Sequence, residues 1–245
     1  MAPDRVSTLE KEADAFARRI SHAVSAFIGH TVPFKATSRG SRFVVTDDTG
    51  GIVIPVGEVG ALALEVNYGC ELDSASRYLK VLKSKVAVYA GSRPKGDPLF
   101  RYEYVHDQGE GLPAGHLHVH AHRDQFTRVM TLAAVSGASR RQAAPDAELE
   151  EARMSRIHFP TGGHRFRPTL EDVLQMIEEE FGAIPGPTWH DVLRTNRVQW
   201  RRHQTGAAVR DCPSEAVRVL EELGYVVSPP PEGPVRDRDD RLAAF

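Results

Sequence analysis

Four histidines alternate with Leu117, Val119 and Ala121 in the stretch Gly-His-Leu-His-Val-His-Ala-His, which runs from residue 115 to residue 122. Successive side chains of a β-strand point to opposite faces of its sheet, so this stretch predicts one histidine face and one apolar face. We expect the apolar face to pack against a core and the histidine face to line a cleft or to meet solvent. The stretch therefore requires a sheet that buries one side of this strand.

Alternating patterns before the histidines predict further strands. Residues 42–46 and 52–56 flank a turn rich in Asp and Gly, which is typical of two strands joined closely. Residues 99–106 alternate again and place Arg101 and Glu103 on the same face of their strand. We expect an α+β fold in which an antiparallel β-sheet carries the histidine-rich strand and helices flank the sheet.

Helical patterns surround the predicted strands. Ser7 and Glu10 form a capping box that predicts the start of an N-terminal helix, and Thr169 with Asp172 predicts the start of another. In both cases apolar residues follow at spacings of three and four, as on one face of a helix.

The chain is expected to divide at the Pro-Gly-Pro sequence that begins at residue 185. We predict an α+β core with its N-terminal helix over residues 1–184 and a small helical C-terminal region over residues 185–227. Residues 228–245 are rich in proline and then in charge, which predicts a disordered tail.

The composition excludes several classes of protein. Of the 245 residues, 41% are hydrophobic and 26% are charged, which excludes wholesale disorder, collagen and coiled coil. The net charge of −2 does not indicate a nucleic-acid binder, and the lack of any run of about 18 apolar residues predicts no membrane span. Cys70 and Cys212 lie outside any CxxC pattern, so we expect a reducing, cytoplasmic location.

The histidine run offers ligands for a metal ion. Histidines two residues apart on a strand stand about 6 to 7 Å apart, so one adjacent pair can share an ion. The candidate ligands are His116, His118 and His120, and imidazole suits a divalent ion such as zinc, nickel or iron. A third ligand is expected from one of four residues: Glu103, His106, His158 or His164.

The same residues also support catalysis without any cofactor. One histidine would act as general base or nucleophile and another as general acid, because imidazole titrates near neutral pH. The candidate catalytic residues are His118, His120, His158 and Glu103. In a third interpretation, the histidines are merely the solvated face of a strand.

Basic residues near the histidines predict a site for a substrate phosphate. Guanidinium groups bind phosphate bidentately, which would suit a nucleotide or RNA. The candidates are Arg101, Arg123, His164 and Arg165, and the alternative is a solvated surface whose charge is partly offset by nearby acids.

Arginines also accompany Trp189 and Trp200 on the helix predicted after Thr188. Basic residues with aromatics can bind nucleic acid. The alternative is that the tryptophans lie in the core and the arginines in solvent.

The histidine run resembles the histidine-triad signature of nucleotide hydrolases and transferases, which implies that His120 or His118 is the nucleophile. A longer stretch, residues 76–181, is similar to the TumE-like toxin family of bacterial type II toxin–antitoxin systems. That resemblance rests on Arg101-Tyr102-Glu103, on the histidine run and on Thr169-Leu170-Glu171 at the start of a helix. It implies a cytoplasmic protein with an antitoxin or other protein partner and with RNA as its target.

The sequence therefore leaves three alternative functions open. The first is a toxin-like, histidine-dependent ribonuclease or nucleotide phosphodiesterase or transferase. The second is a non-enzymatic partner that binds protein or nucleic acid in a toxin–antitoxin or regulatory system. The third is a metal-dependent hydrolase. A homo-oligomer is compatible with all three, because a second subunit could cover an apolar sheet face.

Overall fold

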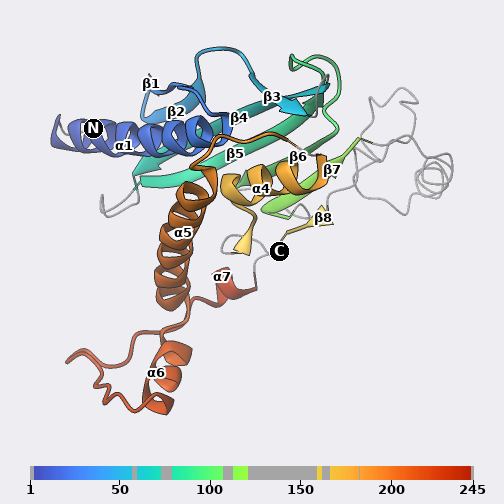
Figure 1. Ribbon diagram of the computed structural model, residues 1–245. Helices are drawn as coiled ribbons and strands as arrows, with labels where there is room; N and C mark the ends of the chain where they lie inside the picture. The colour runs from blue at the N-terminus through green and yellow to red at the C-terminus, as the bar shows by residue number, and fades with distance from the viewer. Residues whose placement is uncertain are drawn as a thin grey trace, which may run out of the picture.

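The protein is built on an antiparallel β-sheet against which helices pack (Figure 1). The computed structural model describes residues 3–56, 60–72, 79–106, 113–120, 159–161, 166–181 and 183–243. The predicted α+β class is confirmed, with a histidine-bearing strand in an antiparallel sheet and small helices near the C-terminus.

The described strands are β1 (Phe34–Arg39), β2 (Arg42–Asp47), β3 (Ile52–Val56), β4 (Gly60–Leu72), β5 (Leu79–Ala90), β6 (Phe100–Val105), β7 (Gly115–Val119) and β8 (Phe159–Pro160). Their order across the sheet is β1-β2-β4-β5-β6-β7-β8, and β3 also pairs with β4. The 13-residue β4 is long enough to pair with β3 over its first half and with β2 over its second. The histidine strand β7 therefore lies far from β1, between β6 and β8.

The two faces of the sheet differ in character. One face, here called the helix face, packs into the main core through residues such as Val66, Val86 and Phe100, with Tyr68, Tyr102 and Leu117 partly buried against them. Strand alternation and pairing place a second set of side chains on the opposite face, here called the polar face: Glu65, Lys85, Arg101, Glu103, His116 and His118. The predicted separation of Leu117 from the histidines is therefore confirmed.

Three helices pack on the helix face: α1 (Pro3–Ile28), α4 (Leu170–Phe181) and α5 (Trp189–Asp211). The apolar residues Ile20, Val24 and Phe27 of α1 recur at helical spacing and are all at most 5% exposed. The helix begins at Pro3, so the predicted start at Ser7 is wrong. Proline is well tolerated in the first turn of a helix, which allows α1 to begin a turn earlier.

The predicted capping box of α4 is confirmed. The Thr169 N–H donates to Asp172 Oδ2 at 2.9 Å, and the Asp172 N–H donates to Thr169 Oγ1 at 3.1 Å. Arg197 of α5 then binds the same turn, donating to Asp172 Oδ1 and to Gln175 Oε1, each at 2.7 Å. Only 18% of the Arg197 side chain is exposed, so the expectation of solvated arginines on this helix is wrong at this position.

The end of α1 meets the segment before α5 at two glycines. Gly29 directly follows the last residue of α1 and has a φ of +83°, which favours glycine. A Cβ atom added to Gly186 would lie 2.6 Å from Gly29 Cα and 2.6 Å from the Ala26 carbonyl oxygen, so no larger residue fits there. Beside this contact the rings of Phe27 and Trp189 pack edge to face, with centroids 5.8 Å apart. The sequence expected to be a linker is therefore packed against α1.

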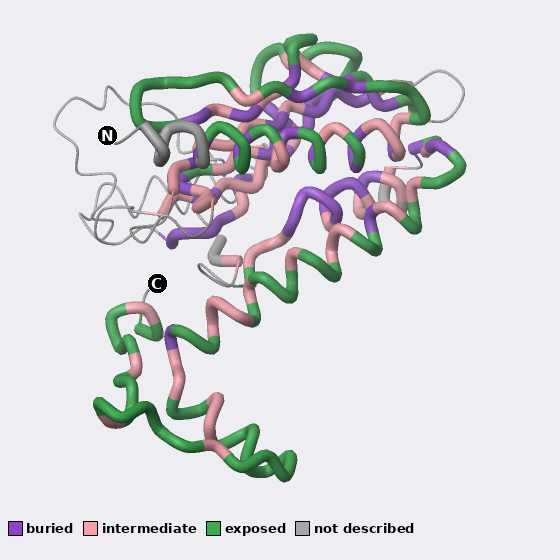
Figure 2. Tube along the Cα trace, turned by 90° about the vertical axis from the view of Figure 1, so that its left-hand side faces the viewer, coloured by how far each residue is buried: buried purple, intermediate pink, exposed green. Residues whose placement is uncertain are grey.

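The C-terminal region extends away from the sheet along α5 and carries α6 (Pro213–Glu222) and α7 (Asp239–Leu242) at its far end (Figures 1 and 2). No residue of α6 is buried, and Pro213 opens that helix. The tail touches the end of α5, because the Arg238 N–H donates to the Asp211 carbonyl at 2.8 Å and the Ser214 N–H donates to Asp237 at 3.0 Å.

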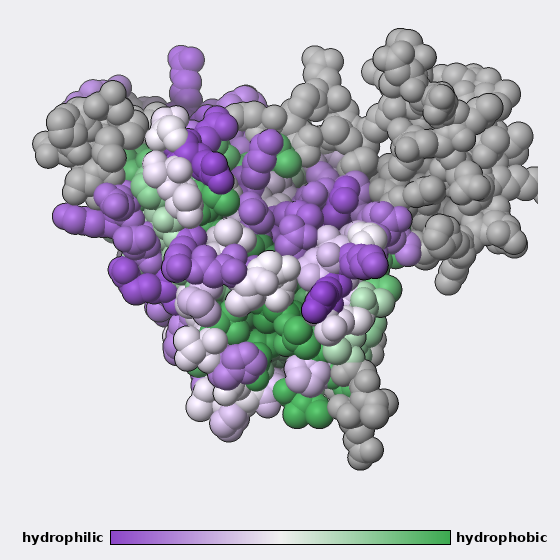
Figure 3. Space-filling view, turned by 90° about the horizontal axis from the view of Figure 1, so that it is seen from above, coloured by the Kyte–Doolittle hydropathy of each residue, from purple (hydrophilic) through white to green (hydrophobic). Residues whose placement is uncertain are grey.

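The surface seen in Figure 3 is mainly hydrophilic around a smaller hydrophobic area. Among the described residues, no helix has the length and apolar character needed to cross a membrane.

Candidate functional site

The pairing of β6 with β7 brings acidic and basic side chains together on the polar face. Glu103 lies opposite His116, and Arg101 lies opposite His118. Paired residues of antiparallel strands point to the same face with Cβ atoms about 5 Å apart, so the four side chains form one cluster. The alternation of each strand is visible in the sequence, but the register between the strands comes from the fold.

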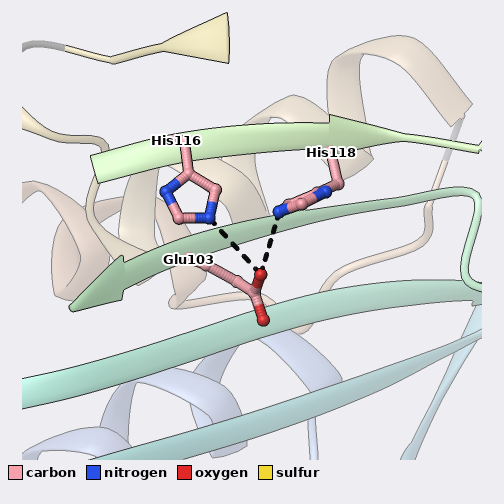
Figure 4. Close-up of side chains that lie close together, drawn as sticks. All are labelled: Glu103, His116 and His118. Atoms are coloured by element: carbon pink, nitrogen blue, oxygen red, sulfur yellow. Dashed lines mark ion pairs between the residues drawn. The ribbon is translucent and has the colours of Figure 1, made fainter. Parts of the chain in front are cut away.

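One carboxylate oxygen lies at the centre of this cluster (Figure 4). Glu103 Oε2 is 3.0 Å from His118 Nε2 and 3.5 Å from His116 Nε2. It is also 3.1 Å from Arg101 Nε. The exposed fraction is only 3% for the His116 side chain and 4% for that of His118. The expectation that these two histidines meet solvent is therefore wrong, because both are buried beside the carboxylate.

The orientation of the His116 ring is fixed by the backbone. Its Nδ1 atom lies 2.9 Å from the carbonyl oxygen of Pro113, which can only accept a hydrogen bond. Nδ1 therefore donates a proton to this carbonyl, and the Nε2 atom points toward Glu103. A backbone carbonyl that holds one ring nitrogen in this way is the usual partner of a metal-binding histidine, because it fixes the ring and its tautomer.

The electrostatic environment favours the ionised form of Glu103. Burial alone would raise the pKa of this carboxyl group. Hydrogen bonds to His116 and His118, together with the nearby charge of Arg101, outweigh burial and hold its pKa well below its ordinary value. The site therefore contains a carboxylate that stays ionised despite partial burial.

The three ligand atoms have the spacing that a metal ion needs. Each of three residues, Glu103, His116 and His118, offers one ligand atom, and these three atoms lie within 4.8 Å of one another. Tetrahedral zinc with ligands at about 2.0 to 2.2 Å places those ligands roughly 3.3 Å apart. The distances of 3.0 and 3.5 Å between the carboxylate and the two imidazoles bracket this value. The two imidazole nitrogens, within 4.8 Å of each other, would have to approach more closely to complete the coordination.

His120 does not share this centre. Strand β7 ends at Val119, and the His120 Nδ1 atom lies 3.9 Å from an oxygen of Asp97. Burial lowers the pKa of His120, with the charge of Asp97 opposing that effect. Of the predicted metal ligands, the structure therefore joins His116 and His118 with Glu103, and His120 lies apart from the group.

The remaining predicted residues fall into two sets. His106 follows β6 on the side of Tyr104, whose hydroxyl lies 3.0 Å from the His106 Nδ1 atom, so it does not join Glu103. Four other candidates lie outside the described residues: Arg123, His158, His164 and Arg165.

A second polar group on the same face was not foreseen. Lys85, directly opposite Glu103 on β5, donates to both carboxylate oxygens of Glu65 at 2.9 and 3.0 Å. The Tyr89 hydroxyl donates to the same carboxylate at 2.8 Å, and burial, aided by this bond, raises the Tyr89 pKa to about 12. Each residue lies in an ordinary alternating strand pattern, so only the pairing of β4 with β5 identifies the group.

Comparison with known proteins gives no relative for this arrangement: no protein-family model, no curated protein and no solved structure matches the chain. The resemblances to the histidine triad and to TumE-like toxins therefore stay predictions. The site has to be interpreted from its own geometry.

Proposed function

We propose that the protein is a metal-dependent hydrolase in which Glu103, His116 and His118 bind one divalent ion. The convergence of three ligand atoms from two neighbouring strands within 4.8 Å carries this proposal. Two imidazoles and a carboxylate suit zinc in particular. Catalytic zinc sites usually have three protein ligands and leave one position for water, whereas structural sites usually have four. Zinc in such a site generates hydroxide near neutral pH.

Arg101 supports a phosphate ester as the substrate. Its Nε atom lies 3.1 Å from Glu103, and 30% of its side chain is exposed. A guanidinium group beside a metal centre binds a phosphate oxygen and stabilises the charge that develops on it. A nucleotide or RNA is the substrate class we propose, and a cytoplasmic, toxin-like role with an antitoxin partner would accord with it.

Metal analysis tests the proposal. The full chain, expressed without a polyhistidine tag, is incubated with zinc, desalted and assayed by atomic emission. We expect about one zinc ion per chain, and Glu103→Gln or His118→Ala should abolish its retention. The matched controls are Glu71→Gln on β4 and His190→Ala on α5, which should retain the ion. A wild-type chain that retains no zinc, or variants that retain as much as the wild type, would overturn the proposal.

Activity is then measured on bis(p-nitrophenyl) phosphate and on a short RNA. Zinc-loaded protein should hydrolyse one or both, and chelation should abolish the reaction. Arg101→Ala should lower the rate by about 100-fold while the zinc content is unchanged, as loss of a transition-state contact does. If the protein retains zinc but hydrolyses neither substrate, it binds metal without being a hydrolase, and the proposed activity is refuted.

A metal-free nuclease is the second candidate, and one specific contact favours it. Glu103 Oε2 lies within 3.5 Å of three nitrogen atoms, from Arg101, His116 and His118. A carboxylate so placed holds a histidine in position, and one histidine can then act as general base and another as general acid. RNA cleavage that persists in a chelator and is lost in Glu103→Gln would select this mechanism over the metal-dependent one.

A further inference from the structure

A cavity of about 100 Å³ lies on the helix face of the sheet, enclosed by α1, α4, α5 and the middle strands. A single water needs only about 10 to 15 Å³ of such space, so this cavity has room for a small organic molecule. Glu103 is among the residues that line it, but His116 and His118 of the candidate metal site are not. The cavity therefore borders the candidate metal site at one residue, and the argument for a ligand rests on other residues of its lining.

The lining is aromatic on several sides. It includes Phe16 from α1, Tyr68 and Tyr102 from the sheet, and Trp200 from α5. Phe16 and Tyr68 pack edge to face with ring centroids 5.0 Å apart and an interplanar angle of 82°. Flat aromatic walls of this kind favour a planar ring as ligand, because stacked and edge-to-face contacts add to the burial of apolar surface.

Two guanidinium groups give the cavity a positive character. Arg167 lies with its Cζ atom 3.7 Å from the Tyr104 ring centroid and 4.8 Å from that of Trp200, so the two rings hold it in place. The Cζ atom of Arg19 lies 5.3 Å from the ring centroid of Phe16. Both arginines line the cavity, and the acidic residues of its described lining are Glu171 on the helix side and Glu103 on the strand side. An arginine fixed between aromatic rings loses little conformational entropy when it binds an anion.

The Tyr68 hydroxyl joins these charges. Burial raises its pKa well above the ordinary value, Glu171 raises it further, and Arg167 and Arg19 lower it. All three charged groups therefore act on the same phenol. Tyr68 lines the cavity, and its hydroxyl is not one of the described buried polar atoms that lack a partner. A ligand in the cavity would accept a hydrogen bond from this hydroxyl in place of water.

We propose that this cavity binds a small planar aromatic compound that carries one acidic group, a carboxylate or a phosphate. The ring lies among Phe16, Tyr102 and Trp200. The acidic group lies between Arg19 and Arg167 and accepts a hydrogen bond from Tyr68.

Calorimetric titration of the full chain tests this proposal with two aromatic anions, indole-3-carboxylate and adenosine 5′-monophosphate. Indole alone, acetate and inorganic phosphate serve as the separate halves of these compounds. We expect at least one aromatic anion to bind, and its affinity should exceed that of either half by tenfold or more. The preferred anion identifies whether the natural acidic group is a carboxylate or a phosphate. Failure of both anions to bind would overturn the proposal. It would also be overturned if indole, acetate or inorganic phosphate alone bound as tightly as the aromatic anions.

Three variants locate the binding. Tyr68→Phe removes only the hydroxyl and should weaken binding about two- to tenfold, the usual effect of one hydrogen bond. Arg167→Lys keeps the charge but not the planar group and should weaken it by about tenfold. Arg201→Ala, on α5 but outside the cavity lining, should leave the affinity unchanged. His118→Ala should also leave it unchanged, so a failure of the metal site and a failure of this cavity are distinguishable. Unchanged affinity in Tyr68→Phe and Arg167→Lys would place the ligand elsewhere and refute the proposal.

Discussion

The partly buried Glu103 and the buried Glu171 lie on opposite sides of the sheet, and their pKa values shift in opposite directions. Burial raises the pKa of both Glu103 and Glu171. At Glu103 the hydrogen bonds to two histidines and the charge of Arg101 outweigh burial and lower the pKa. At Glu171 the hydrogen bonds from Thr169 and Asn196 only reduce the effect of burial, and the pKa is raised. Neighbouring groups, and not depth alone, decide which carboxylate is available as an anionic ligand.

The comparison extends to the whole sheet. The helix face buries apolar side chains under three helices and contributes most of the stability. The polar face places charged groups beside one another and carries the candidate metal site. Substitutions on the helix face should therefore leave metal binding unchanged, and substitutions on the polar face should leave the apolar core unchanged.

The largest effect is expected from the helix face. Leu174 of α4 is 0% exposed, so Leu174→Ala should lower the free energy of unfolding by about 2 to 5 kcal/mol. Denaturant titration measures this loss, and the zinc content of the folded fraction should not change. Val53→Ala, at a position 44% exposed, is the control and should cost less than about 0.5 kcal/mol. Loss of zinc from folded Leu174→Ala protein would show that the two faces are coupled.

An intermediate effect is expected on adding metal. Zinc at 100 times its dissociation constant should raise the free energy of unfolding by about 2.7 kcal/mol, because the ion binds the folded state. Glu103→Gln preserves the size of the side chain and should abolish this gain, whereas Glu71→Gln should keep it. Melting curves with and without zinc provide the measurement. If Glu103→Gln still gained stability on adding zinc, the metal would be shown to bind at other residues.

The smallest effect is expected from pH at Glu171. Because the folded state raises the pKa of this group, its ionisation destabilises the fold as pH rises through that pKa. Glu171→Gln should therefore be more stable than the wild type at neutral pH, and the advantage should shrink toward pH 4. Melting temperatures across this range measure the difference, with the exposed Glu10→Gln as control. An advantage that grows as the pH falls would contradict the raised pKa.

Local patterns in the sequence predict much of this architecture. The alternation around Leu117 predicts which side chains share a face of β7, and the pattern around Glu103 does the same for β6. The capping box at Thr169 predicts the start of α4, because both hydrogen bonds form within one turn. Such features depend on neighbours a few residues away, which is why the sequence is informative about them.

The site itself depends on contacts that no local pattern contains. The register that sets Glu103 opposite His116 is fixed by the pairing of two strands, and a shift of one residue would turn the carboxylate to the other face. The burial of His118 likewise depends on the fold. The cavity brings together Arg19, Tyr68 and Arg167 from distant parts of the chain. None of these three stands out in its own sequence context.

The close contact of Gly29 with Gly186 has a consequence for the order in which the chain acquires its structure during synthesis. The two glycines are separated by 157 residues. A ribosome that adds about 5 to 20 residues per second needs roughly 8 to 30 s to make that stretch. During this interval α1 can settle on β1 and β2, but the ring of Phe27 has no Trp189 to pack against. The end of the first helix therefore stays uncovered on the nascent chain until the start of α5 emerges.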